Sequence, residues 1–122
     1  MKFKTYISLL ICFITLTINA QESALKTSVS KNKLGVNQRL RVEFSINKQG
    51  ADNFTPPNFK NFKVVGGPSQ SVSQSWINGK ATFSQSYTYI IQPKRKGEFT
   101  IPSASIDIDG ETIKSNPVKI IV

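Results

Sequence analysis

Residues 68–102 read PSQSVSQSWINGKATFSQSYTYIIQPKRKGEFTIP, and this stretch predicts a long β-hairpin. Asn78-Gly79 stands between two runs of strand-forming residues, 69–77 and 80–92. Asn-Gly favours a two-residue type I′ turn, because both central residues of that turn need positive φ. The hairpin should end at Pro93, which has no N–H to donate to a ladder, and a corner with a new strand should follow.

Closing the hairpin at Asn78-Gly79 also predicts which residues share a face of the sheet. The predicted cross-strand pairs include Ile77–Lys80, Trp76–Ala81 and Val72–Gln85. One face carries Val72, Trp76, Phe83, Tyr87, Tyr89 and Ile91, and the other carries Ser71, Ser73, Ser75, Thr82, Ser84, Ser86 and Thr88. An apolar face opposite a hydroxyl-rich face is typical of a strand pair half-buried in a sheet. We therefore expect Trp76 and the Tyr87–Tyr89 pair to belong to the core or its rim.

The rest of the chain predicts further short strands and no helix beyond the N-terminal segment. Leu40, Val42, Phe44 and Ile46 alternate strictly with polar residues across 39–47. Other strands are predicted at 24–30, 59–65, 98–101, 104–108, 111–115 and 117–122. This pattern predicts an all-β fold, an immunoglobulin-like antiparallel β-sandwich of about seven to nine strands. An open barrel is the alternative.

Proline and glycine predict where strands are interrupted. Pro56-Pro57 is incompatible with a central strand, so residues 47–58 are predicted to form a loop. Gly66-Gly67-Pro68 is predicted to end the strand before the hairpin. Pro102 interrupts the strand that begins at Glu98, which indicates a sheet edge or a switch between sheets.

The N-terminus has the layout of a secretory signal peptide. Lys2 and Lys4 precede a largely apolar run over residues 6–18, and polar residues follow Ala20. We therefore predict a signal helix within residues 1–20, cleavage between Ala20 and Gln21, and an exported β-domain over residues 21–122 in the periplasm or cell envelope. A membrane anchor is the alternative, although the run is shorter than the roughly 20 residues that a spanning helix needs.

The composition argues against common kinds of catalysis. The chain has no His, and its one Cys, Cys12, lies in the predicted signal peptide. The expected mature chain thus lacks the usual nucleophile–base pairs and the soft metal ligands. Asp107–Glu111 holds several carboxylates, but a calcium loop needs more ligands, and Asp109-Gly110 already reads as a hairpin turn. We predict no enzyme activity, no metal and no cofactor; a hydrolase is the remaining catalytic alternative, without a recognisable carboxylate pair.

The chain is basic, with 16 Lys and Arg against 7 Asp and Glu and a formal net charge of +9. The basic residues are spread along the sequence, and Lys94-Arg95-Lys96 forms the one run of three. We interpret the charge mainly as solvated surface. An anionic envelope partner (a lipid headgroup, a glycan or an acidic protein) is the first alternative, and we expect no nucleic-acid partner.

The candidate contact site is the turn end of the hairpin. Gln74 and Gln85 lie on its core-facing side, which indicates that this end projects beyond the core. An exposed aromatic residue there would anchor an interface. The candidate partner contacts are Trp76, Ile77, Lys80, Lys94, Arg95 and Lys96. The alternative is a solvated sheet surface.

Motifs spread over residues 21–122 resemble one family. These are Phe54, Pro57, Phe59, the run Phe62-Lys63-Val64-Val65-Gly66-Gly67-Pro68-Ser69, then Ser86-Tyr87-Thr88-Tyr89, Pro93, Gly97-Glu98-Phe99-Thr100-Ile101-Pro102 and Ser115-Asn116-Pro117-Val118. Together they are similar to the first extracytoplasmic domain of BatD, the aerotolerance (oxygen tolerance) protein family of Gram-negative bacteria. The resemblance implies immunoglobulin-like domains outside the cytoplasmic membrane, a C-terminal membrane anchor, and von Willebrand factor A-type partners beside a MoxR-type ATPase. It implies no catalytic motif.

The resemblance and the residues together predict a non-enzymatic, exported protein-interaction domain of a BatD-like envelope complex linked to oxygen and stress tolerance. A glycan- or surface-binding module that uses Ser71, Ser73 and Thr82 is the alternative. The sequence stops at Val122, after one domain. We expect either a fragment of a longer reading frame or a free single-domain relative, attached to the membrane by association or through a missing C-terminal anchor.

Overall fold

A computed structural model describes residues 23–122, which form nine β-strands and no helix. The strands are β1 (Lys26–Val29), β2 (Leu40–Ile46), β3 (Ala51–Thr55), β4 (Phe62–Ile77), β5 (Lys80–Pro93), β6 (Glu98–Ile101), β7 (Ser105–Ile108), β8 (Glu111–Lys114) and β9 (Val118–Ile121). The predicted signal peptide, residues 1–20 with cleavage between Ala20 and Gln21, lies outside the described residues. No helix able to span a membrane is found in the part that the structure describes.

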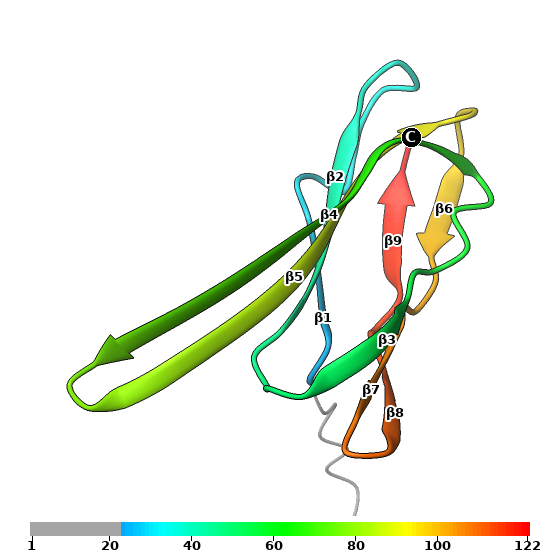
Figure 1. The fold of residues 1–122 in the computed structure, drawn as a ribbon. Helices are drawn as coiled ribbons and strands as arrows, with labels where there is room; N and C mark the ends of the chain where they lie inside the picture. Colours follow the sequence, from blue (N-terminus) through cyan, green and yellow to red (C-terminus); the bar gives the residue numbers. More distant parts are fainter. Residues whose placement is uncertain (1–22) are drawn as a thin grey trace, which may run out of the picture.

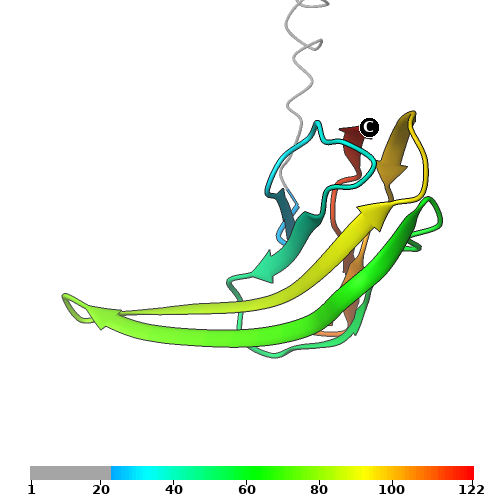
Figure 2. The same ribbon diagram turned by 90° about the horizontal axis from the view of Figure 1, so that it is seen from above.

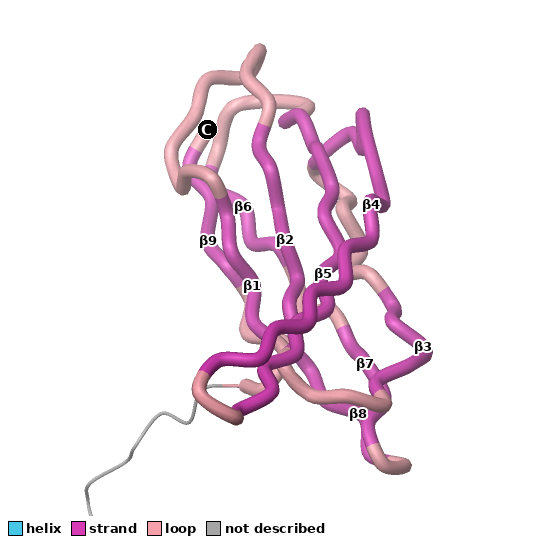
Figure 3. Tube along the Cα trace, turned by 60° about the vertical axis from the view of Figure 1, so that its left-hand side comes forward, coloured by secondary structure: helices cyan, strands magenta, loops and turns pink. Residues whose placement is uncertain are grey.

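The strands form two layers with an immunoglobulin-like order (Figures 1 and 3). One layer is the four-stranded antiparallel sheet β1-β2-β5-β4, and the other holds β3-β7-β8 and β6-β9. The turn at Asp109-Gly110 joins β7 to β8. β6 precedes β7 and β9 follows β8, and these two outer strands also pair with each other, so the four strands form one interrupted hairpin. The two layers thus correspond to the A-B-E-D and C-F-G sheets of a constant-type immunoglobulin domain. The predicted all-β sandwich is confirmed.

The chain after β1 crosses between the two layers. Lys33 makes a parallel bridge to Ile121 of β9, where Leu34 N–H donates to the Ile121 carbonyl at 3.0 Å and Ile121 N–H donates to the Asn32 carbonyl at 2.9 Å. The N-terminal segment therefore pairs with β2 in one sheet and with β9 in the other, which ties the two layers together at one side.

The core lies between the two layers and draws its largest side chains from both. β2 contributes Leu40, Val42, Phe44 and Ile46, all at most 2% exposed. Burial of such a side chain stabilises the fold by about 1.5–3 kcal/mol before conformational entropy is subtracted. The facing layer contributes Phe99, Ile101, Ile106, Ile108 and Ile120. The strict alternation seen in the sequence of β2 thus directs one side of this strand into the core.

The hairpin register agrees with the sequence prediction. Ile77 pairs with Lys80, Trp76 with Ala81 and Val72 with Gln85. Asn78 and Gly79 have φ of 51° and 78°, as a type I′ turn requires. The second short hairpin has the same turn at Asp109 and Gly110, with φ of 51° and 79°.

The predicted strand end at Gly66-Gly67-Pro68 is wrong, because β4 runs without a break from Phe62 to Ile77. The register shifts between Val64 and Gly66 and again between Gly66 and Ser69, so the ladder absorbs these residues as an irregularity. Val64, the last residue before the first shift, is 44% exposed.

The predicted loop at 47–58 is also wrong in part, because it contains the strand β3. β3 pairs with β7, and its register is irregular between Asp52 and Thr55, where Asn53 has φ of 52°. A short, polar strand with a bulge lacks the alternation of apolar residues by which strands are recognised. Its pairing partner, rather than its own sequence, therefore determines that it is a strand.

Pro102 and Pro117 interrupt two neighbouring strands, and a serine side chain bridges the gap. Pro102 separates β6 from β7, which belong to different hydrogen-bonded sheets, as the sequence predicted. In the gap, Ser115 N–H donates to the Ala104 carbonyl at 2.9 Å, and Ala104 N–H donates to Ser115 Oγ at 2.8 Å. Ser115 is 2% exposed, so its hydroxyl satisfies a buried donor where the ladder is broken.

We predict that Ser115→Ala lowers the free energy of unfolding by about 1–3 kcal/mol, because Ala104 N–H loses its buried acceptor. Urea denaturation monitored by far-ultraviolet circular dichroism measures the free energy of unfolding of each variant. Ser73→Ala, on an exposed strand position, is the matched control and should change stability by less than about 0.5 kcal/mol. Equal stability of the two variants would contradict the role assigned to the Ser115 hydroxyl.

We predict that Gly67→Ala destabilises the fold more than Gly50→Ala. Both glycines have positive φ, of 88° and 82°, so both substitutions incur the same backbone strain. A Cβ at Gly67 would lie 2.4 Å from the Thr88 carbonyl oxygen, whereas a Cβ at Gly50 meets nothing within 4 Å. The free energy of unfolding of Gly67→Ala, measured by thermal or urea denaturation, should be about 1–3 kcal/mol lower than that of Gly50→Ala, because the β4–β5 ladder must shift. Similar losses for both would show that the close approach is not important.

Candidate functional site

The most distinctive feature of the described residues is a hairpin arm that leaves the body of the sandwich (Figures 1 and 2). β5 has 14 residues but β2 has 7, and their pairing ends at Ile46–Gln85. Beyond that pair β5 is bonded to β4 alone. We call residues 72–85 the arm; at about 3.3 Å per residue it reaches roughly 20 Å past β2.

The arm exposes apolar side chains that a core would normally bury. Trp76 is 77% exposed, Ile77 is 63% exposed and Val72 is 59% exposed. The expectation that Trp76 belongs to the core or its rim is therefore wrong, whereas Tyr89 is buried at 6% exposure and Tyr87 is partly buried. Apolar and polar residues alternate regularly along the hairpin. The facing layer, however, covers the apolar side chains only in the half of the hairpin that is farthest from the Asn78-Gly79 turn. The predicted projection is confirmed, but Gln85, one of the two residues that indicated it, is 9% exposed and pairs with Ile46 at the base of the arm.

Aromatic stacking anchors the base of the arm. The ring of Phe54, on β3, stacks on the ring of Tyr87 with centroids 4.0 Å apart and planes 5° apart. Gln85 Nε2 donates to the Tyr87 hydroxyl at 2.6 Å. Burial raises the pKa of Tyr89 above its ordinary value, and the neighbouring Tyr87 adds a smaller effect in the same direction. The stack and the hydrogen bond orient the base of the arm, and the raised pKa keeps the Tyr89 phenol neutral.

The two faces of the arm differ in chemistry. Val72, Trp76 and Phe83 lie on the face that continues the core side of the sheet, while Ser75 and Thr82 share the other face, where their hydroxyls hydrogen-bond to each other. Between Lys63 and Lys94 the sequence holds one charged residue, Lys80, although the whole chain has 23. The arm is thus a ribbon with a single charge on a basic protein.

The six predicted contact residues lie on two separate surfaces. Trp76, Ile77 and Lys80 are at the tip of the arm, while Lys94, Arg95 and Lys96 follow the opposite end of β5. Arg95 is engaged locally: its guanidinium lies 5.3 Å from the centroid of the Phe99 ring, and its Nη2 donates to Asn61 Oδ1 at 3.2 Å. The corner and the tip therefore do not form one site.

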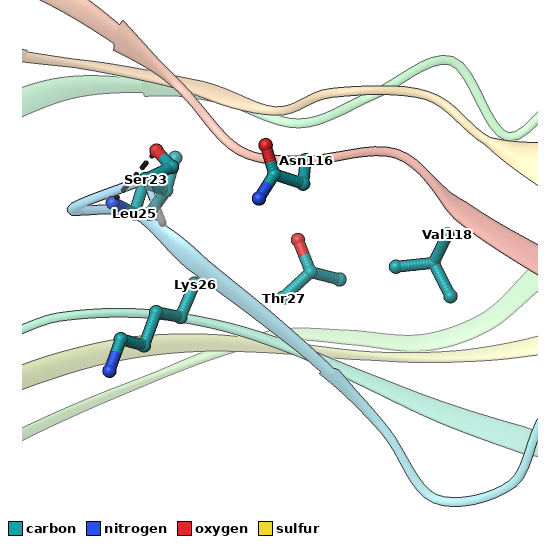
Figure 4. A pocket seen from close by; sticks show the side chains of 6 residues that line it. All are labelled: Ser23, Leu25, Lys26, Thr27, Asn116 and Val118. Carbon is teal, nitrogen blue, oxygen red and sulfur yellow. Dashed lines mark hydrogen bonds between the residues drawn. The ribbon is translucent and has the colours of Figure 1, made fainter. Parts of the chain in front are cut away.

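A hollow lies between β1 and the segment that joins β8 to β9 (Figure 4). Its volume is about 240 Å³, below the roughly 300–1,000 Å³ of ligand pockets. It is lined by Ser23, Leu25, Lys26, Thr27, Asn116 and Val118. Asn116 points toward Thr27, whose buried Oγ1 has no hydrogen-bond partner among residues 23–122 (Figure 4). The hollow borders the undescribed residues at Ser23, so it carries no assignment.

The acidic turn makes local contacts. Asp107 accepts hydrogen bonds from Thr112 Oγ1 at 2.8 Å and from Asn53 Nδ2 at 3.2 Å. Over residues 23–122 no three Asp, Glu, His or Cys side chains gather as metal ligands would. Both oxygens of Asp107 thus connect β7 to its two neighbours, β8 and β3.

A scan against protein families matches residues 27–122 to the BatD DUF11 like domain. The chain belongs to the BatD family. The match covers β1 to β9, including the arm, and agrees with the resemblance carried by the Gly66–Ser69 and Gly97–Pro102 motifs. Searches of curated proteins and of solved structures return no match.

Sequence reasoning identified the arm but missed two of its parts. Alternation along the hairpin predicts a core-facing side chain for Val72, and Pro56-Pro57 predicts a loop around Phe54, the residue that supports the arm. A signal for the first was present in the sequence: the alternating segment that became β2 is about half as long as the hairpin strand it pairs with. The part of the hairpin beyond that segment must lack a neighbour on one side.

We predict that Trp76→Ala leaves the free energy of unfolding within about 0.5 kcal/mol, as for an exposed site. The matched control is Ile91→Ala, on the same strand pair but fully buried, which should lose about 2–5 kcal/mol. Chemical denaturation monitored by far-ultraviolet circular dichroism compares the two. A loss above about 2 kcal/mol for Trp76→Ala would mean that the indole is packed.

Proposed function

We propose that this BatD-family domain is a non-catalytic, exported protein-interaction domain of a cell-envelope complex linked to oxygen and stress tolerance. The arm is its contact element. The observation that carries the proposal is the exposure of Trp76, Ile77 and Val72 on a ribbon that the rest of the described chain does not cover. Large aromatic side chains at an exposed position anchor protein interfaces.

Family membership supports the envelope setting. BatD proteins are expected to act beside von Willebrand factor A-type partners, and the signal-peptide layout of residues 1–20 agrees with export. The chemistry of residues 23–122 supports contact, because the three most exposed large apolar side chains, Val72, Trp76 and Ile77, all lie on the arm. The arm reaches away from the sandwich, so a partner can bind it without disturbing the core.

A glycan-binding module is the second candidate, favoured by the hydroxyl-rich face of the arm. Ser73, Thr82 and Ser84 on the arm, and Ser71 just before it, are exposed on this face and offer both donors and acceptors. The Ser75–Thr82 pair, by contrast, satisfies part of its hydrogen-bonding capacity internally. The two candidates place the contact on opposite faces of one ribbon, so substitutions on each face separate them.

The test is affinity purification of the tagged, exported chain from envelope extracts of its host. We expect a von Willebrand factor A-type protein to co-purify with the unmodified chain and to be lost with Trp76→Ser plus Ile77→Ser. Two exposed apolar anchors of this kind are each worth about 1–4 kcal/mol of binding, so the loss should be nearly complete. Immunoblotting or mass spectrometry of the eluate measures it.

The matched control is Ser71→Ala plus Thr82→Ala on the opposite face, which should leave co-purification unchanged. Recovery of the chain alone, under conditions that keep other envelope complexes intact, would overturn the protein-interaction proposal. Binding on a glycan array that the Ser71→Ala plus Thr82→Ala variant abolishes would favour the second candidate instead.

A further inference from the structure

The outer edge of the arm is open for strand pairing. β4 is the last strand of its sheet and pairs with β5 alone among the described strands. Its ladder with β5 is irregular up to Ser69 and then regular over nine residues, from Ser69 to Ile77. Such an edge presents a row of unpaired N–H and C=O groups, which is a template for another strand.

This edge lacks the devices that normally protect an edge. Natural edges carry charges, prolines or bulges, or are very short. Residues 69–77 contain no charge and no proline, and their ladder has no bulge. The rest of the chain is rich in Lys and Arg, so two copies repel one another except where this uncharged edge faces its equivalent. The arm also holds the basic bodies apart, because it projects roughly 20 Å beyond β2.

The backbone geometry specifies which groups are free. The closing pair of a two-residue hairpin, Ile77–Lys80, is hydrogen-bonded, and bonded and non-bonded pairs alternate from there. Gln70, Val72, Gln74 and Trp76 therefore direct their N–H and C=O groups away from β5. These four residues are arranged symmetrically about Ser73, the centre of the regular ladder.

We propose that the β4 edges of two copies of this chain pair antiparallel about a two-fold axis at Ser73. The pairing joins Gln74 to Val72 of the second copy and Trp76 to Gln70 of the second copy. It forms a continuous four-stranded sheet in the order β5-β4-β4-β5. This inference rests on the proposed function of the arm as a contact element and names one partner for it, the chain itself.

Side-chain chemistry supports this register. On the face that continues the core side, Trp76 lies diagonally next to Val72 of the second copy, and an aromatic side chain reaches such a neighbour. Trp76 and Val72, which the single chain leaves 77% and 59% exposed on the arm, thus shelter each other. On the opposite face Ser71 meets Ser75, Ser73 meets its equivalent and Ile77 meets Ser69, so no like charges are opposed.

A membrane surface fits the arm less well than a second copy of the chain does. An anionic bilayer would attract basic residues near the inserted tip, but Lys94, Arg95 and Lys96 lie at the other end of β5. Lys80 is the one basic residue beside Trp76 and Ile77 at the tip. The contact between two arms is small beside the roughly 1,600 Å² of a standard interface, so the dimer should be weak and concentration-dependent.

Disulfide trapping tests the register. In a Cys12→Ser background the introduced cysteine is the single thiol. At the axis, Ser73 and its symmetry equivalent form a non-bonded pair with Cα atoms about 4.5 Å apart, which a disulfide can bridge. We expect Ser73→Cys to form a covalent dimer under mild oxidation and Ser71→Cys or Ser75→Cys alone not to do so. A mixture of Ser71→Cys and Ser75→Cys should form the heterodimer, because these two positions oppose each other.

Equal cross-linking of all three single variants would indicate random collision and overturn the proposal, as would the absence of any cross-link. Sedimentation equilibrium of cysteine-free chain gives a second measurement. Ser73→Lys, which opposes two lysines at the axis, should lower the association constant several-fold. The matched control is Ser84→Lys, on the strand paired with Ser73, which should leave association unchanged. The reverse result would assign the contact to β5 and overturn the pairing of β4 edges.

Two further outcomes separate this inference from the proposed function. If unmodified and Ser73→Lys chains are both monomeric but still co-purify with an envelope protein, the self-pairing is wrong and the proposed function stands. If the dimer forms but no envelope protein is captured, the self-pairing stands and the proposed function is wrong. If monomeric chain binds phosphatidylglycerol vesicles and Trp76→Ala abolishes this binding, the partner of the arm is a membrane and the self-pairing is wrong.

Discussion

The structure depends on a mismatch in length between two paired strands. β2 has 7 residues and β5 has 14, so only the half of β5 from Gln85 to Ile91 gains a second neighbour. On that half, β2 pairs with the backbone and the facing layer packs against the apolar side chains. The other half pairs with β4 alone and becomes the arm. One strand thus serves the core at one end and the molecular surface at the other.

This division explains how a stable core and an exposed aromatic tip coexist. The core side chains of β2 pack against the layer of β3, β6, β7, β8 and β9, and the Phe54–Tyr87 stack closes that core where the arm leaves it. Past this stack no element of the described chain faces Val72 or Trp76. Exposed apolar surface of this kind is retained by proteins that use it for contact. The match to the BatD family covers the arm together with the core.

The absence of charge over residues 64–93, apart from Lys80, has a physical consequence of its own. A basic protein repels copies of itself and is attracted to acidic partners, and long-range forces of this kind weaken within about 10 Å at ordinary salt. The tip of the arm lies beyond β2 by roughly twice that distance. Whatever binds the arm therefore meets hydrogen-bonding edges and apolar side chains before it meets the charge of the body.

Local patterns determined much of this fold directly from the sequence. The Asn78-Gly79 turn set the register of the hairpin, and the alternation in β2 identified the core face, because turn geometry and a period of two are properties of neighbouring residues. The tertiary structure alone decided that β3 is a strand, that β4 continues through Gly67-Pro68, and that Trp76 is exposed. Each of these depends on which strand lies alongside, and how far it extends, and no residue carries that information locally.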